Sequence, residues 1–86
     1  MYEIVTKSKR AEKQYYEVLL LRKSISERLE KLKIDPRREC DAHKLKGELT
    51  SLWSCSLGSD IRMVYRIDDE KKEIVVFAAG SHKIYG

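Results

Sequence analysis

The sequence contains few residues that interrupt a chain or cross-link it. Its 86 residues include four glycines, one proline and two cysteines. The cysteines, Cys40 and Cys55, have no paired metal-ligand spacing, so the sequence predicts no zinc site, and we expect neither a metal nor a cofactor. No apolar run approaches the roughly 20 residues that a membrane span requires. The start does not resemble a secretory signal, so we expect a cytoplasmic protein without membrane contact.

The length and composition of the chain predict one small soluble domain. A chain of 86 residues is enough for a single core, so residues 1–86 are expected to form one domain. Apolar residues make up 42% of the chain and charged residues 37%, which predicts a folded protein with a heavily solvated surface. The net charge of +4 is compatible with a phosphate-rich partner, although many surface helices carry similar charge.

The first half of the sequence predicts a short strand followed by helix. Residues 2–6 alternate polar and apolar side chains, and Thr6 or Ser8 can cap the helical pattern that starts at Lys9. This pattern continues to Lys33. Its apolar positions are spaced by three or four residues and form one face, made of Val18, Leu21, Ile25, Leu29 and Leu32.

The helical segment is expected to bend near Ser24, although its pattern also allows one long helix. We favour a hairpin of two helices because short helices pack well on a small sheet. The pair Asp35-Pro36 then ends the second helix, since proline has no N–H to donate and disfavours the helical region for its predecessor.

The second half of the sequence predicts a three-stranded meander. The runs 52–57, 61–67 and 73–79 are rich in strand-forming residues, and they are separated by Gly58-Ser59 and by the polar turn 68–72. A strand, two helices and then a meander predict an α+β domain, with a hairpin of helices packed on one face of a small antiparallel sheet.

Alternation along each strand divides the sheet into two faces. One face is expected to be apolar and to receive the helices: Trp53, Cys55, Leu57, Ile61, Met63, Tyr65, Ile67, Ile74, Val76 and Ala78. In this arrangement Trp53 and Cys55 belong to the core. The other face brings together Ser54, Ser56, Arg62 and Arg66, and an arginine pair on a half-apolar face is what an RNA-binding groove needs.

Three segments of the second half resemble a known family. They are His-Lys-Leu-Lys-Gly-Glu at 43–48, Arg-Met-Val-Tyr-Arg-Ile at 62–67 and Gly-Ser-His-Lys-Ile-Tyr-Gly at 80–86. With the length and element order of the whole chain, they resemble the RelE/ParE toxin superfamily, and most of all its YafQ- and RelE-type mRNA interferases. The resemblance implies a microbial-RNase-like fold and a type II toxin. Such a toxin enters the A site of the 70S ribosome, where it contacts ribosomal RNA and cuts mRNA, and a cognate antitoxin neutralises it.

The same resemblance implies a set of site residues. His43 and His82 match histidines that act around the scissile phosphate, and Asp60 matches an acidic residue of the same group. Arg62 matches the arginine that holds the phosphate, and Tyr85 matches a C-terminal aromatic residue that stacks on or orients the cut nucleotide. The residues expected to bind RNA or the ribosome are Lys44, Lys46, Ser54, Ser56, Arg66 and Lys83.

These residue types suit cleavage of RNA without a metal. The reaction needs a base for the 2′-hydroxyl, a cation for the charge on phosphorus and an acid for the leaving 5′-oxygen. Histidine titrates near neutrality, and arginine offers paired donors with a fixed charge. The alternative is that the histidines are solvated loop residues and that the arginines of 61–67 pair with nearby carboxylates.

Two other functions are compatible with the sequence. One is a ParE-like toxin, which shares the fold and inhibits gyrase by binding without chemistry; two histidines in the site argue against it. The other is a degenerate RNA- or ribosome-binding module. Ser54 and Ser56 favour this second alternative, because the RelE and YafQ patterns have lysines or a histidine at or near these positions.

Overall fold

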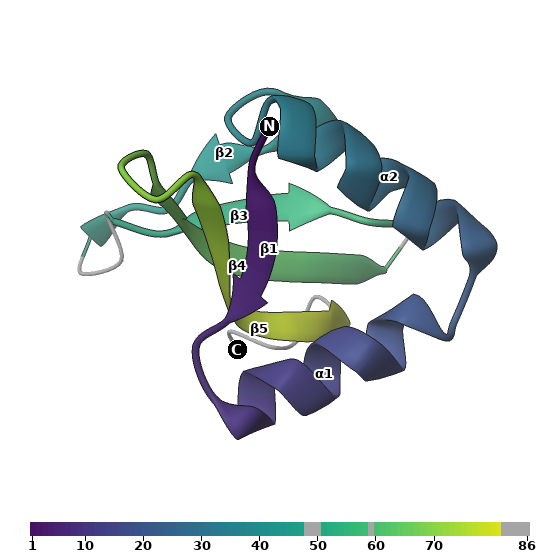
Figure 1. The fold of residues 1–86 in the computed structure, drawn as a ribbon. Coiled ribbons are helices and arrows are strands. Elements are labelled where there is room, and N and C mark those ends of the chain that lie inside the picture. Colours follow the sequence, from purple (N-terminus) through teal and green to yellow (C-terminus); the bar gives the residue numbers. More distant parts are fainter. Residues whose placement is uncertain (48–50, 59, 82–86) are drawn as a thin grey trace.

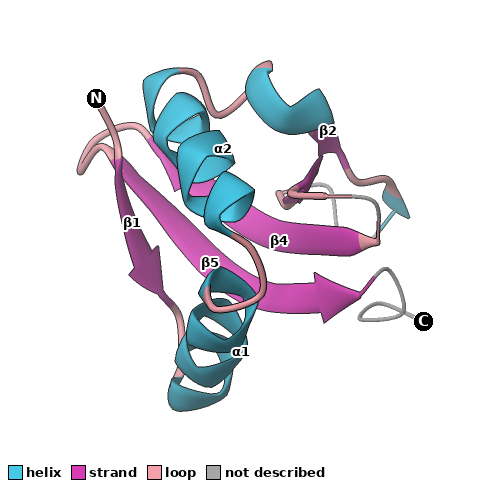
Figure 2. Cartoon of the chain, turned by 90° about the vertical axis from the view of Figure 1, so that its right-hand side faces the viewer, coloured by secondary structure: helices cyan, strands magenta, loops and turns pink. Residues whose placement is uncertain are grey.

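The computed structural model describes residues 1–47, 51–58 and 60–81, which form a five-stranded sheet and two α-helices (Figure 1). The strand order across the sheet is β1-β5-β4-β3-β2. Both helices contribute side chains to one core on the same side of the sheet (Figure 2). In chain order the elements are β1 (Glu3–Thr6), α1 (Lys9–Leu19), α2 (Lys23–Ile34), the 3-10 turn η1 (Glu39–Asp41), β2 (His43–Lys44), β3 (Trp53–Ser56), β4 (Ile61–Asp68) and β5 (Glu73–Ser81).

The two predicted helices are present, and the break between them comes slightly earlier than predicted. Ser8 caps α1, because its Oγ accepts a hydrogen bond of 3.1 Å from the Ala11 N–H. The connection between the helices covers residues 20–22, so Ser24 lies inside α2. Leu21 falls in this connection and is 58% exposed, so its predicted place on the buried helix face is wrong. The cause is the change in chain direction, which interrupts the helical phase at that residue.

The predicted meander is confirmed, and two edge strands extend it. β3, β4 and β5 pair antiparallel in sequence order. β1 runs parallel to β5, with Glu3 opposite Glu73, so the sheet is mixed rather than wholly antiparallel. On the other edge, His43 and Lys44 form β2 antiparallel to β3, a strand that the sequence does not predict. Backbone pairing therefore fixes the position of His43.

The face of the sheet toward the helices, called here the inner face, carries the hydrophobic core. Tyr65 and Cys55 are both fully buried in it, as the alternation predicts. Burial raises the pKa of the Cys55 thiol well above its ordinary value, so this cysteine is an uncharged core residue. The helices contribute Val18, Ile25, Leu29 and Leu32, which pack with Cys55, Leu57, Met63, Tyr65, Ile74, Val76 and Ala79.

One irregularity changes which side chains of β5 reach this core. The pairing changes from Val64 opposite Ala78 to Tyr65 opposite Val76, which leaves Phe77 as the extra residue of a bulge. Because of this extra residue, Ala79 joins the core and is 3% exposed. The prediction that Ala78 lies on the inner face is therefore wrong, since simple alternation does not hold across a bulge.

Candidate active site on the outer face of the sheet

The face opposite the helices, called here the outer face, places His43 and Arg62 on one surface. His43 pairs with Ser54 across β2 and β3, and Ser56 pairs with Arg62 across β3 and β4. Directly paired residues point to the same face, and so do residues two apart on one strand. Ser54 and Ser56 are two apart on β3, so they connect His43 to Arg62 across the outer face.

The register sets the spacing between the two candidate catalytic groups. Neighbouring strands are about 4.8 Å apart and alternate residues of a strand about 6.8 Å apart, so the Cα atoms of His43 and Arg62 are separated by roughly 12 Å. His43 is exposed and Arg62 is half-buried. The spacing leaves room for a phosphodiester between an imidazole and a guanidinium group.

The hydrogen bond of His43 defines the chemistry of its ring. Its Nδ1 lies 3.2 Å from the backbone carbonyl oxygen of Asp41. A carbonyl oxygen only accepts hydrogen bonds, so Nδ1 carries the proton in this contact. A neutral imidazole has a single N–H, which leaves the lone pair of Nε2 free to accept a proton.

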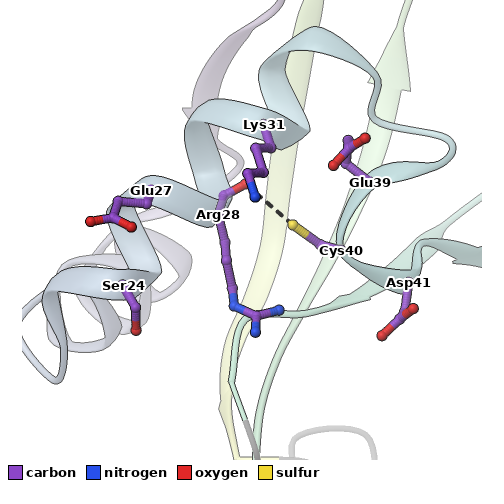
Figure 3. Close-up of a pocket in the computed structure, with 7 residues that line it drawn as sticks. All are labelled: Ser24, Glu27, Arg28, Lys31, Glu39, Cys40 and Asp41. Carbon is purple, nitrogen blue, oxygen red and sulfur yellow. Dashed lines mark hydrogen bonds between the residues drawn. The ribbon is translucent and has the colours of Figure 1, made fainter.

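An unusual backbone segment presents that carbonyl. Cys40 and Asp41 both adopt the left-handed conformation, with φ values of 58° and 55°. For residues other than glycine this conformation costs roughly 1–2 kcal/mol per residue. The Cys40 thiol donates a hydrogen bond of 3.2 Å to the Arg28 carbonyl on α2, which holds the segment against the helix (Figure 3).

A polar pocket lies beside this segment, between α2 and η1. Figure 3 shows that side chains from both elements line it, with Arg28 and Lys31 on α2 and Glu39 on η1. Cys40 also lines the pocket. Burial is the main cause that raises the pKa of its thiol above the ordinary value. Cys40 therefore remains a neutral hydrogen-bond donor and is not a reactive thiolate.

The structure separates the predicted RNA-binding residues into different places. Arg66 lies on the outer face of β4 and is exposed, as the alternation predicts. Ser56 is half-buried, and its hydroxyl donates to the Gly58 carbonyl at 3.1 Å. Ser54 is fully buried, which leaves no exposed hydroxyl for a contact with RNA.

The two lysines near His43 that are predicted to bind RNA or the ribosome lie in different places. Lys44 pairs with Trp53, so it lies on the opposite face of β2 from His43. Lys46 is exposed beyond the end of β2, and Asp60 is exposed immediately before β4. The remaining candidates, His82, Lys83 and Tyr85, are outside the described residues.

A second charged cluster, which no sequence pattern predicts, lies at the turn between β4 and β5. Arg37 donates to both carboxylate oxygens of Asp69, at 2.7 and 3.3 Å, and the Tyr2 hydroxyl donates to the same carboxylate. These contacts, the one from Arg37 foremost, lower the pKa of Asp69 to about 2. Arg37 also lies over the Trp53 ring, 6.0 Å from its centre. No local pattern marks this pair, because Arg37 and Asp69 are far apart in the sequence.

The fold is shared with small bacterial toxins. A copper-bound mutant toxin from Helicobacter pylori is 25% identical to this chain, with all of both chains covered and a TM-score of 0.74. The YoeB–YefM complex from Staphylococcus aureus contains a chain that is 24% identical, with 95% of this chain and 98% of that one covered and a TM-score of 0.71. A YoeB/ParE toxin from Agrobacterium tumefaciens is 19% identical over 93% and 98% of the two chains, with a TM-score of 0.73.

The architecture is thus that of the RelE- and YoeB-like toxin class. Within this class, the family described as the bacterial toxin of type II toxin–antitoxin systems, YafQ, matches residues 3–85. The chain therefore belongs to the YafQ toxin family. No curated protein matches it. Within residues 1–47, 51–58 and 60–81, neither helix has the length and apolar character needed to cross a bilayer.

Proposed function

We propose that this protein is a ribosome-dependent endoribonuclease that cuts mRNA in the ribosomal A site and thereby inhibits translation. Its membership of a toxin family supports a toxin role. The observation that supports chemistry is the outer face, where paired strands bring His43 and Arg62 to one surface. A toxin that acts by binding alone has no need of an imidazole and a guanidinium group on one surface.

The proposed reaction is attack of a 2′-hydroxyl on the adjacent phosphorus. Arg62 offsets the negative charge that develops on the phosphate oxygens, because its guanidinium group keeps a fixed charge and paired donors. Two histidines, His43 and His82, supply the base for the 2′-hydroxyl and the acid for the leaving 5′-oxygen. Asp60 orients one of the reacting groups, and Tyr85 stacks on the nucleotide that is cut. These side chains provide the base, cation and acid of the reaction without a metal.

Binding to the ribosome is proposed to use the exposed positive charges around this face. Lys46 and Arg66 are exposed and are available to phosphates of mRNA or ribosomal RNA. Ser56 and Lys83 are proposed to complete these contacts, and Lys44 is proposed to contact the ribosome from the opposite face of β2. Ser54 is proposed to act as a spacer between His43 and its neighbours, because its side chain is buried.

The proposed protein partner is a cognate antitoxin in the cytoplasm. The heterotetrameric YoeB–YefM toxin–antitoxin complex from Staphylococcus aureus, which has a similar fold, supports an equivalent partner for this chain. Several exposed apolar side chains on or near the helices are proposed to contact the antitoxin. Among them are Leu20, which is 87% exposed, and Tyr16, which is 57% exposed.

The test is a map of new RNA 5′ ends in cells after induction of the wild type, His43→Ala, Arg62→Ala and His82→Ala. We expect cuts inside translated frames at a fixed codon phase with the wild type, and their loss in each variant. Ser26→Ala is a matched control on an exposed position of α2 and is expected to cut like the wild type. Growth arrest without new ends would instead indicate a ParE-like toxin that binds gyrase. The absence of both effects would indicate a degenerate binding module.

A further inference from the structure

We infer that His43 is the general base of the proposed cleavage, and that the left-handed Cys40–Asp41 turn is the positioning element that holds it in the base-competent tautomer. The inference rests on the proposed function. It goes beyond that function because it assigns a direction of proton transfer to one histidine and a role to two residues that the proposed function does not use.

The tautomer follows from the partner of the ring. The Asp41 carbonyl oxygen, 3.2 Å from Nδ1, accepts the only N–H of the neutral imidazole. Nε2 then takes the proton of the 2′-hydroxyl while the 2′-oxygen forms its bond to phosphorus. The bond from phosphorus to the 5′-oxygen breaks, and the leaving oxygen receives a proton from the acid. The products are a 2′,3′-cyclic phosphate and a 5′-hydroxyl, and the resulting imidazolium keeps its Nδ1–H on the carbonyl.

The turn is held from two sides, which explains why it retains two left-handed residues in succession. On one side, the Cys40 thiol donates to the Arg28 carbonyl of α2 (Figure 3). On the other side, the Ala42 N–H donates to the Glu39 carbonyl at 3.1 Å, and the chain then enters β2. The pairing of His43 with Ser54 fixes the ring's own backbone. The acceptor and the ring are therefore both anchored, which is how a positioning contact keeps a catalytic histidine in one tautomer.

The first experiment is ¹⁵N NMR of the histidine rings in the purified wild-type protein, at a pH where the rings are neutral. The chain has two histidines, so His43→Gln assigns the signals. We expect the His43 ring to carry its proton on Nδ1. A ring protonated on Nε2 would overturn the inference directly, whatever the behaviour of any variant.

The second experiment changes the turn and leaves the histidine intact. Asp41→Val places a β-branched residue where the left-handed conformation is strongly disfavoured, whereas Asp41→Asn keeps a residue that tolerates it. We expect Asp41→Val to lose the Nδ1–H signature and to cleave ribosome-bound mRNA about 10- to 100-fold more slowly, because the base loses its alignment. The conservative Asp41→Asn variant is expected to keep the Nδ1–H signature and most of the wild-type rate. Asp41→Ala replaces Asp41→Val if circular dichroism shows that the latter is unfolded.

The outcomes separate this inference from the proposed function. If His43→Ala abolishes cleavage while a folded Asp41→Val keeps both the tautomer and the rate, the positioning role is wrong and the nuclease stands. If His43→Ala cleaves like the wild type, the assignment of His43 as the base is wrong. If the wild type cleaves no ribosome-bound mRNA, the proposed function itself fails, while the NMR result still reports on the turn.

Discussion

The inner and outer faces of the same sheet differ in packing and in the chemical groups that they expose. On the inner face, Met63 and Tyr65 are fully buried against the helices, and apolar contacts decide which residues are acceptable there. On the outer face, Arg62 and Arg66 alternate with them along the same strand and keep part or all of their exposure. One strand therefore serves the core with its odd positions and the proposed reaction with its even positions. Substitutions on the two faces should separate stability from activity.

The largest expected effect is on cleavage and comes from the outer face. Arg62→Ala should lower the rate of mRNA cleavage on ribosomes by about 10²–10³-fold, the effect of removing one preorganised charge-stabilising group. Arg66→Ala, four residues along the same face, should cost less than 10-fold and act mainly on binding, because the proposed phosphate contact belongs to Arg62, whereas Arg66 is an exposed residue proposed only to bind RNA. Single-turnover cleavage assays measure both rates. Equal losses would mean that the face acts only as a charged surface.

The next effect is on stability and compares two neighbouring residues of β4. Met63 is fully buried on the inner face, whereas Val64 points to the outer face and is 6% exposed. Met63→Ala should lower the free energy of unfolding by about 2–5 kcal/mol, because it leaves a cavity in the core. Val64→Ala removes fewer atoms and should cost less. Urea unfolding measures both, and the cleavage rate per folded molecule should be unchanged in Met63→Ala. A loss of that rate would show that the two faces are not independent.

The sequence predicts the inner face well because that face obeys a simple period. Alternation along β4 correctly assigned Met63 and Tyr65, and the helical spacing correctly assigned Ile25 and Leu29. The pattern failed at Phe77, since a bulge that no glycine or proline marks shifts the alternation by one residue. It also failed at Leu21, which lies in the connection between the helices.

The outer face was predictable in its residue types but not in its geometry. A strand of two residues such as β2 carries no detectable period, so the pairing of His43 with Ser54 came only from the structure. The left-handed turn that supports His43 consists of Cys40 and Asp41. Of these two residue types, only aspartate is enriched in the left-handed conformation, so the sequence does not predict the turn. The interaction of Arg37 with Asp69 depends on tertiary contact and leaves no local signal.

A smaller effect tests a polar contact made from the inner face. The Tyr65 hydroxyl is buried and donates a hydrogen bond of 2.6 Å to the Pro36 carbonyl, and burial raises the pKa of this phenol well above its ordinary value. Tyr65→Phe should lower the free energy of unfolding by about 1–2 kcal/mol, because the carbonyl loses its buried partner. Tyr16→Phe is the control, since Tyr16 is 57% exposed, and it should change stability little. Equal effects in urea unfolding would mean that the contact with Pro36 contributes nothing.

The smallest effect concerns the ion pair between Arg37 and Asp69 at the end of the sheet. This pair is part of neither the core nor the proposed active site. The pKa of Asp69 is lowered to about 2 by Arg37 and Tyr2, from an ordinary value of 3.8. The folded protein therefore holds this proton less tightly than the unfolded chain. The pair stabilises the fold above about pH 3.8, and the stabilisation is lost as the pH falls toward 2. Because both groups are largely solvated, the effect on stability should be small and weakened by salt.

NMR titration of the Asp69 carboxyl should show the low pKa in the wild type and its return toward the ordinary value in Arg37→Gln. An unchanged pKa in that variant would contradict the role of Arg37, and an altered cleavage rate would show that this end of the sheet contributes to the site.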